Sequence, residues 1–393
     1  MDQVIYFDNN ATTRVAPEVL EKMLPYFCER YGNPSSIHSF GGSVAADVEN
    51  ARVQVAELLG AKFRDRDGVA TEIIFTSCGT EGDNAAINAA FLARPGRNKL
   101  VTTAVEHPAV LSYAKELERS GREVVLVPVD GRGRLDMAFL KQAVDENTAV
   151  VSAMWANNET GTVFPVGEIA EIAHAAGALF HTDAVQAAGK LPIDVDALGI
   201  DFLSISGHKL HAPKGVGALY VRRGVRFSPL IMGGHQERSR RGGTENVASV
   251  IGMGEACRIA REGMDAEYRQ LSFLRDRLEK AICAAVPKVH VNGDLENRLP
   301  NTSSISFESI EGESILMLLN MHNICASSGS ACTTGSLEPS HVMRAMGIPY
   351  TSAHGTVRFS LSRYNTQEEV DFVCKVIPPI IARLREISPY WEK

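Results

Sequence analysis

Short apolar runs alternate with helix-like segments through the middle of the chain, between residues 72 and 221. The intervening segments, such as PAVLSYAKELERS (108–120) and VGEIAEIAHAAG (166–177), carry apolar residues at helical spacing. The runs with strand character are EIIFT, NKLVTT, EVVLVPV, AVVSAMW, ALFHT, FLSIS and GALYV. This alternation predicts an α/β fold in which a mainly parallel, seven-stranded sheet is covered by helices on both faces.

Helical patterns also flank this predicted core. Before it, PEVLEKMLPYFCERY (17–31) and GSVAADVENARVQVAELLG (42–60) place apolar residues at helical spacing. After it, residues 249–286 predict a long helix that leads into the rest of the chain.

The last third of the chain predicts a smaller α+β unit. Its segments are SSISFES, ESILMLLN, TVRFSLS and QEEVDFVCKVIPPIIARLREI. We therefore expect residues 16–260 to form a large domain and residues 261–393 a small one. Residues 1–15 are expected to form an amino-terminal arm that joins the small domain.

Composition and charge narrow the class of partner. The chain has 393 residues, is 45% hydrophobic and carries a formal net charge of -7, which gives no support for binding nucleic acid or an anionic membrane. No apolar run approaches the roughly 18 residues of a membrane span. The start, MDQVIYFDNN, lacks the pattern of a signal peptide, so we expect a cytoplasmic protein whose partners are small molecules or proteins.

The cysteines single out one loop. Their number, seven, is odd and no CxxC pair occurs, which argues against a disulfide framework and against an intrinsic metal site. Cys332 lies in SSGSACTTGS (327–336), where small residues cannot build a core and two glycines ease backbone movement. We expect a mobile, exposed loop whose thiol suits a reactive role. The alternative is a surface loop in which the cysteine is incidental.

Lys209 lies in the densest cluster of candidate residues, SISGHKLHAPKGVGALYV (204–221). Asp183 ends another apolar run, and ligands of open α/β sheets bind at the carboxyl ends of strands, so the two side chains could converge there. Pyridoxal phosphate needs a lysine for its aldehyde and a carboxylate for its ring nitrogen. Taken singly, a lysine is ordinarily a solvated charge and an aspartate at a strand end is often a helix cap.

A phosphate site should accompany this pair. SCGTEGDNAA (77–86) runs from a strand into a helix and offers the backbone amides of Gly79 and Thr80, although such a start can be mere capping. Ser206 and His208 flank the lysine and could add donors.

His107 follows a further strand in VEHPAV, where its ring could stack on a pyridine or transfer protons. Alternatively, local hydrogen bonds before Pro108 satisfy it. Four strand ends thus supply candidate groups, and their convergence predicts a pyridoxal phosphate site. These groups are Thr80, His107, Asp183 and Lys209.

Over nearly its whole length the sequence resembles the pyridoxal-phosphate-dependent cysteine desulfurases of the NifS and IscS kind, which have fold-type I architecture. The motifs ANNETG, HTDAVQ, SGHKLHAPKG, RRGGTEN, SSGSACTTGSLEPSHVMRAM and VRFSLSRY occur in family order. FTSCGTE, MWANNETGT and GGHQER look most like the nitrogen-fixation NifS branch. The resemblance implies conversion of L-cysteine to L-alanine, with sulfur supplied to iron–sulfur cluster assembly for nitrogenase.

The resemblance also implies roles for individual residues around the cofactor. Lys209 would form the Schiff base, Asp183 would pair with the pyridine nitrogen and His107 would stack on the ring. Asn158 and Gln186 would contact the region of the cofactor's 3-oxygen. The residues implied to hold the phosphate are Gly79, Thr80, Ser206 and His208.

Further implied roles concern the substrate, the second subunit and the sulfur. Asn33 and Arg358 would hold the substrate carboxylate, for which a guanidinium fork is well suited. Thr244 would reach the phosphate in the other subunit of a homodimer. Cys332 would accept the substrate sulfur as a persulfide and pass it to a protein acceptor such as an iron–sulfur scaffold.

Two other thiols and three rival functions stay open at this point. Cys78 stands where many relatives have alanine, and Cys325 follows an apolar run; we expect both to be bystanders. The rivals are an aminotransferase, a lyase acting on selenocysteine or a kynurenine-like substrate, and a sulfur-transfer scaffold that has no cofactor.

Overall fold

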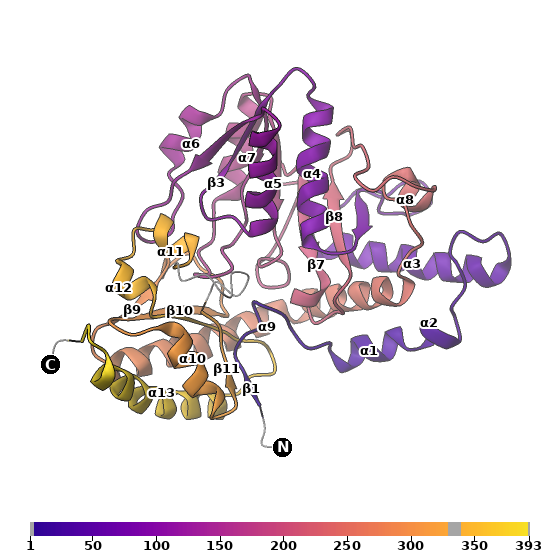
Figure 1. Cartoon of the computed structure of the whole chain (residues 1–393). Helices are drawn as coiled ribbons and strands as arrows, with labels where there is room; N and C mark the ends of the chain where they lie inside the picture. Colours follow the sequence, from indigo (N-terminus) through magenta and orange to yellow (C-terminus); the bar gives the residue numbers. More distant parts are fainter. Residues whose placement is uncertain (1–3, 329–338, 392–393) are drawn as a thin grey trace.

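A computed structural model describes residues 4–328 and 339–391 of the chain. Figure 1 shows two parts, a larger one around a central sheet and a smaller one that contains the carboxyl-terminal helix, with the long helix α9 (Val247–Ala285) running along both.

The seven predicted strands form one sheet in the order β2-β8-β7-β6-β5-β3-β4. Only β8 runs antiparallel to its neighbours, so the prediction of a mainly parallel seven-stranded sheet is confirmed. The strands are β2 (Ile73–Thr76), β3 (Lys99–Thr103), β4 (Glu123–Val127), β5 (Thr148–Ser152), β6 (Leu179–Asp183), β7 (Phe202–Ser206) and β8 (Gly217–Val221).

Successive strand residues point to opposite faces of this sheet, and each face is covered by helices. On one face Leu100 and Val150 pack against α4, while on the other Val101 and Val151 lie in the core that also includes α3 and α9. Burial on both faces explains why the strands read as continuous apolar runs. The helices before α8 are α1 (Pro17–Met23), α2 (Pro25–Cys28), α3 (Ser39–Leu58), α4 (Gly79–Ala93), α5 (Pro108–Arg119), α6 (Met137–Ala143) and α7 (Val166–Ala175).

The smaller part contains an antiparallel sheet of order β12-β10-β9. A two-stranded parallel sheet joins β1 (Ile5–Tyr6) of the arm to β11 (Ile324–Cys325). The remaining elements are α8 (Gln236–Ser239), β9 (Val289–Asn292), β10 (Thr302–Phe307), α10 (Gly312–Asn320), α11 (His341–Ala345), α12 (Tyr350–Ala353), β12 (Thr356–Ser360) and α13 (Gln367–Ile387).

The expected domain boundary near residue 260 falls inside α9. Ala260 packs in the core beside the large sheet, whereas Leu271 packs in the core of the smaller part. In the arm, Ile5 and Phe7 belong to the smaller core and Ala16 to the larger one. The division into domains itself stays a prediction.

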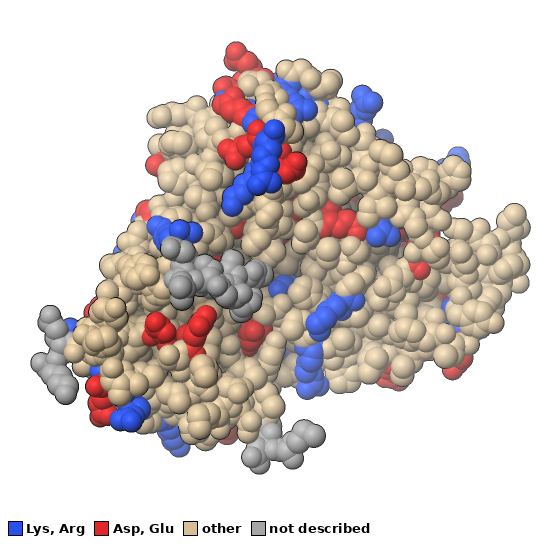
Figure 2. Space-filling model, in the orientation of Figure 1, with Lys and Arg blue, Asp and Glu red and all other residues tan. Residues whose placement is uncertain are grey.

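Charged side chains of both signs are interspersed on the face shown in Figure 2. Among the described helices, none combines the length and the apolar character that crossing a membrane requires.

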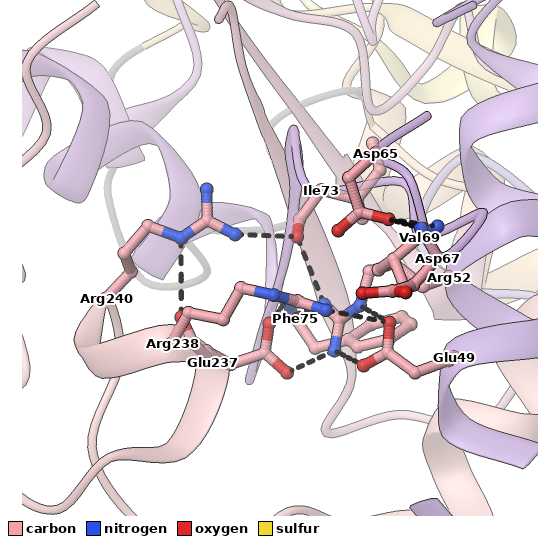
Figure 3. A network of polar contacts seen from close by, with 10 residues as sticks. All are labelled: Glu49, Arg52, Asp65, Asp67, Val69, Ile73, Phe75, Glu237, Arg238 and Arg240. Atoms are coloured by element: carbon pink, nitrogen blue, oxygen red, sulfur yellow. Dashed lines mark hydrogen bonds and ion pairs between the residues drawn. The ribbon is translucent and has the colours of Figure 1, made fainter. Parts of the chain in front are cut away.

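A buried ion pair ties α3 to β2 and α8 (Figure 3). The Arg52 guanidinium donates to both carboxylate oxygens of Glu237, at 2.5 and 2.9 Å, and also contacts Glu49. Both members of the pair also bond to the backbone of β2: Arg52 donates to the Ile73 carbonyl, and Glu237 accepts from the Phe75 amide. Few polar atoms of the pair are left unsatisfied, which is the condition under which buried charges are tolerated.

This ion pair holds an unusual turn. Glu237, Arg238 and Ser239 have φ values of 46°, 57° and 61°, a left-handed conformation that costs energy in residues other than glycine. The turn directs Arg241 onto Glu81, which it contacts at 3.0 and 3.2 Å in the first turn of α4. The ion pair therefore helps to place the amino end of α4.

Replacing Arg52 with methionine should lower the free energy of unfolding by about 3–5 kcal/mol, because the buried Glu237 carboxylate would lose the guanidinium that compensates its charge. Chemical denaturation measures this change. The control is Lys62→Met, which removes an exposed ion pair with Asp194 and should leave the unfolding midpoint unchanged. Equal effects of the two substitutions would contradict the assigned role of Arg52.

Candidate active site

A cavity of about 370 Å³ opens at the carboxyl ends of the sheet strands, where the topology of an open α/β sheet places ligands. Segments that follow β2, β3, β5, β6 and β7 line it, together with the arm and β12. Its volume lies within the usual range of small-molecule sites. The structure thus brings ten predicted site residues together: Gly79, Thr80, His107, Asn158, Asp183, Gln186, Ser206, His208, Lys209 and Arg358.

Lys209 ends a single turn of 3₁₀ helix that directly follows β7. Its Nζ donates to the backbone carbonyls of Asn10 and Ala11, the latter at 2.7 Å. Burial, together with the nearby charges of Arg358 and Lys190, lowers the pKa of Lys209 to about 7. A substantial fraction of this amine is therefore neutral near pH 7, as a nucleophilic amine requires.

Asp183 ends β6 and is 6% exposed. Burial raises the pKa of Asp183 to about 7, and the adjacent Asp83 carboxylate raises it too. A cationic group placed against this carboxylate would reverse that shift, since opposite charge favours the ionised form. The environment therefore suits a partner that carries a positive charge, such as a protonated ring nitrogen.

His107 caps the amino end of α5, because its Nδ1 accepts from the Ala109 amide at 3.1 Å. Burial lowers the pKa of His107, so the ring is neutral at pH 7 and carries its proton on Nε2. A neutral, flat ring on the cavity wall can stack on an aromatic ligand.

The amino end of α4 provides an anion site at one end of the cavity. Its cap residue, Cys78, makes no side-chain capping bond, which leaves the first backbone amides of a 15-residue helix facing the cavity. At Gly79 a Cβ would lie 2.8 Å from Val185 Cγ2, so only glycine fits there. Within the described ranges, 4–328 and 339–391, Ser206 Oγ is buried without a hydrogen-bond partner, as is Gln186 Oε1. These unsatisfied groups fit a bound phosphate and a further polar ligand atom.

Arg358 lies on β12 and is part of the cavity wall. Its Nη2 forms an ion pair with Asp8 at 2.8 Å, and its Nη1 donates to the Asn158 carbonyl at 3.0 Å. Its Nε is buried and has no hydrogen-bond partner among the residues that the structure describes. The guanidinium therefore retains a donor for an incoming carboxylate.

Two predicted site residues, although described by the structure, are not among those that line the cavity. Asn33 is exposed before α3 and accepts from the Ser35 amide at 2.9 Å. Thr244 is exposed on the segment between α8 and α9. Cys332 lies outside the described residues.

Sequence reasoning missed several residues of the cavity wall, among them Asn10, Ala11 and Asp83. Asp83 follows Gly79 by four residues in α4, and helical spacing alone places the two on one face. Burial raises the pKa of Asp83 to about 7. Asn10 and Ala11 gave no such signal, because they reach the cavity only through the tertiary fold.

Comparison with known proteins identifies the family. The family model "Aminotransferase class-V" matches residues 5–373. The chain belongs to this family. It is similar to the cysteine desulfurase NifS of Azotobacter vinelandii, with 59% identity over 98% of this chain and 95% of the relative. The resemblance to cysteine desulfurases of the NifS kind and the fold-type I architecture are thereby confirmed.

Two solved structures of this kind are also similar to the chain. A NifS-like protein superposes with a TM-score of 0.90 at 40% identity, covering 97% of this chain and all of the other. A second, titled "SspA in complex with cysteine", superposes with a TM-score of 0.80 at 35% identity, covering 92% of this chain and all of the other. Members of the family are enzymes that depend on pyridoxal phosphate.

The low pKa of Lys209 can be tested directly. After hydroxylamine treatment to remove any imine-bound cofactor, modification of Lys209 by an amine-reactive reagent should reach half its maximal rate near pH 7, because only the neutral amine reacts. Peptide mass spectrometry at a series of pH values measures this. Lys62, an exposed amine whose pKa is raised by Asp194, should react only at much higher pH. Identical pH profiles for the two lysines would contradict the assignment.

Proposed function

We propose that the chain is a pyridoxal-phosphate-dependent cysteine desulfurase that converts L-cysteine to L-alanine and collects the sulfur on Cys332. The observation that carries the proposal is the single cavity in which Lys209, Asp183 and His107 meet Arg358, in a chain so similar to a NifS desulfurase. A scaffold without a cofactor would have no need for a buried, partly neutral lysine beside a buried aspartate.

The cavity fits the cofactor. When bound, pyridoxal phosphate supplies an aldehyde that condenses with amines and a protonated ring that draws electrons from the substrate α-carbon. Lys209 would hold the aldehyde, Asp183 the ring nitrogen and His107 the ring face. The amide groups of α4 at Gly79, with the free hydroxyl of Ser206, would hold the phosphate.

Other polar groups of the cavity complete this binding. Asn158 and Gln186 would contact the cofactor's 3-oxygen. The Oε1 atom of Gln186, which is buried without a partner among the described residues, could accept from a hydroxyl at that position or from an intervening water. Thr80 and His208 would complete the contacts to the phosphate. Burial lowers the pKa of His208 to about 4, so it would act there as a neutral hydrogen-bond donor.

Arg358 would bind the substrate and Lys209 would transfer its protons. Arg358 would bind the L-cysteine carboxylate through the donor that Asp8 and Asn158 leave free. Lys209, whose pKa is about 7, would take the proton from the substrate α-carbon and later return one to a carbon atom. Asn33 would assist with the carboxylate, although it lies outside the cavity wall in this chain.

Cys332 would act as the sulfur acceptor. Its thiolate would form an S–S bond with the substrate sulfur as the substrate C–S bond breaks, and the electron pair of that bond would stay with carbon, which is then protonated to give alanine. The described residues on either side support this role. Ser327 pairs through its backbone with Arg358, and Ser340 donates to Glu159 at 2.6 Å, so the chain enters and leaves the segment that holds Cys332 beside the cavity.

The wider assignment extends to partners. We propose a homodimer in which the exposed Thr244 completes the phosphate site of the other subunit. The persulfide on Cys332 would pass sulfur to a protein acceptor of iron–sulfur cluster assembly, with nitrogenase as the destination suggested by the NifS relatives. The expected cytoplasmic location stays a prediction.

Replacing Cys332 with serine should abolish alanine formation from L-cysteine while preserving the visible absorbance of the cofactor, since the hydroxyl cannot accept sulfur. Alanine assay and absorbance spectroscopy measure the two effects, and mass spectrometry should show one added sulfur atom on Cys332 of the unaltered protein. Cys325→Ser serves as the control and should keep the activity, because Cys325 does not line the cavity. Full activity of the Cys332 variant would refute the assignment.

Replacing Arg358 with methionine should raise KM for L-cysteine at least about tenfold, because a charge-assisted bond to the carboxylate is lost. Steady-state kinetics measures KM and kcat. Arg277→Met is a matched control, since it breaks an exposed ion pair with Asp371 and neither of these two residues lines the cavity. An unchanged KM in the Arg358 variant would remove this residue from the substrate site.

A further inference from the structure

Asn10, in the amino-terminal arm, is 2% exposed and is bonded to both parts of the molecule. Its side-chain Nδ2 donates to the Asn158 carbonyl at 3.1 Å and to Thr302 Oγ1 at 2.8 Å. Its Oδ1 accepts from Asn301 Nδ2 at 3.0 Å. The amide group thus bridges the wall of the cavity and the end of β10.

The backbone of Asn10 makes the same connection. Its N–H donates to Ser360 Oγ at 2.8 Å, on β12. Its carbonyl accepts from Gln186 Nε2 at 3.1 Å and from Lys209 Nζ. With the side-chain contacts, Asn10 takes part in six hydrogen bonds.

The partners of Asn10 fall into two groups. Three belong to the small α+β part: Asn301, Thr302 and Ser360. The other three line the cavity and are the residues proposed to hold the cofactor's aldehyde and 3-oxygen: Asn158, Gln186 and Lys209. Asn10 therefore fixes the relative positions of these two groups through its side chain and its backbone. Each broken bond would leave a buried polar group desolvated and unpaired.

We propose that Asn10 is a positioning residue that fixes Asn158, Gln186 and Lys209 against the small α+β part, and thereby sets the geometry in which pyridoxal phosphate is held. This inference rests on the proposed function, because it concerns the cofactor of that reaction.

The residues next to Asn10 extend the connection to the substrate side. Ala11 offers its carbonyl to Lys209 Nζ, and Asp8 pairs with Arg358. The arm therefore contacts the arginine through Asp8 and the lysine through residues 10 and 11. Displacement of this stretch would alter the two ends of the cavity together.

The preceding residue, Asn9, supplies a matched control. It is also buried, and its Nδ2 contacts the Tyr6 carbonyl, the Ser360 carbonyl and Asn365 Oδ1, at 3.1, 2.9 and 3.4 Å. All of these partners lie in the arm or the small α+β part, and Asn9 is absent from the wall of the main cavity. Truncating Asn9 removes comparable hydrogen bonds without touching the cofactor residues.

The experiment compares Asn10→Ala with Asn9→Ala in the full chain. The dissociation constant of pyridoxal phosphate is measured by absorbance titration, the melting temperature by calorimetry, and kcat and KM by alanine formation. Asn10→Ala removes the bond to the Asn158 carbonyl and the side-chain bonds that hold the Asn10 backbone in place. Because that backbone offers its carbonyl to Gln186 and Lys209, the substitution should weaken cofactor binding about tenfold or more and lower kcat. Asn9→Ala should lower the melting temperature to a similar extent while its cofactor affinity stays within about twofold of the unaltered chain.

Thr302→Val provides a second variant that keeps the shape of the side chain. It removes one acceptor of Asn10 from outside the cavity and should weaken cofactor binding in the same direction as Asn10→Ala, by a smaller factor. If Asn10→Ala fails to fold, this variant decides the question alone.

Unchanged cofactor affinity in Asn10→Ala, or an equal loss in Asn9→Ala, would overturn the proposal. If Asn10→Ala does not fold, an unchanged affinity of Thr302→Val for pyridoxal phosphate would also overturn the proposal. If the unaltered protein binds pyridoxal phosphate but makes no alanine, the proposed function fails, whereas the comparison of affinities still decides the role of Asn10.

Discussion

Removal of the Lys209 amine from water is the physical constraint around which the site is built. A buried ammonium is costly, so the amine either loses its proton or finds acceptors. Both responses are visible: burial brings the pKa of Lys209 to about 7, and two carbonyls of the arm accept from the nitrogen. The arm, the strand ends and β12 must all be in place to exclude water from this one atom.

The remaining charges of the cavity follow from the same low-dielectric environment. Asp183 and Asp83 are buried near each other, and two like charges so placed cannot both be ionised without a cation nearby. On the other side, Arg358 and Lys190 favour the neutral form of Lys209. Such a cavity has a place for a positive ring nitrogen and, at α4, another for a negative phosphate. The charged residues of the cavity thus favour a ligand with a positive group near Asp183 and a negative group near α4.

Most of the fold could be predicted from the sequence, because six buried strands and the partly exposed edge strand β4 leave seven apolar runs, and the connecting helices leave a 3.6-residue period. The residues at the strand ends, such as His107 and Asp183, could be predicted for the same reason, since a parallel sheet brings them to one edge. Asn10 could not be, because its contacts come from residues about 150 to 350 positions away and no local pattern records them. The left-handed turn at Glu237 could not be predicted either, because it is held by an ion pair with Arg52, which is 185 positions away in the sequence.

The ion pair between Asp8 and Arg358 joins residues that are 350 positions apart in a chain of 393. During synthesis the amino-terminal segments leave the ribosome first, and β12, which carries Arg358, emerges only after all strands of the large sheet have been made. The large sheet can form earlier, but its cavity stays open on one side until β12 is in place. A ligand of this cavity would therefore be enclosed only after that point, and a product that ends before Arg358 would have the lysine without the enclosure that tunes it.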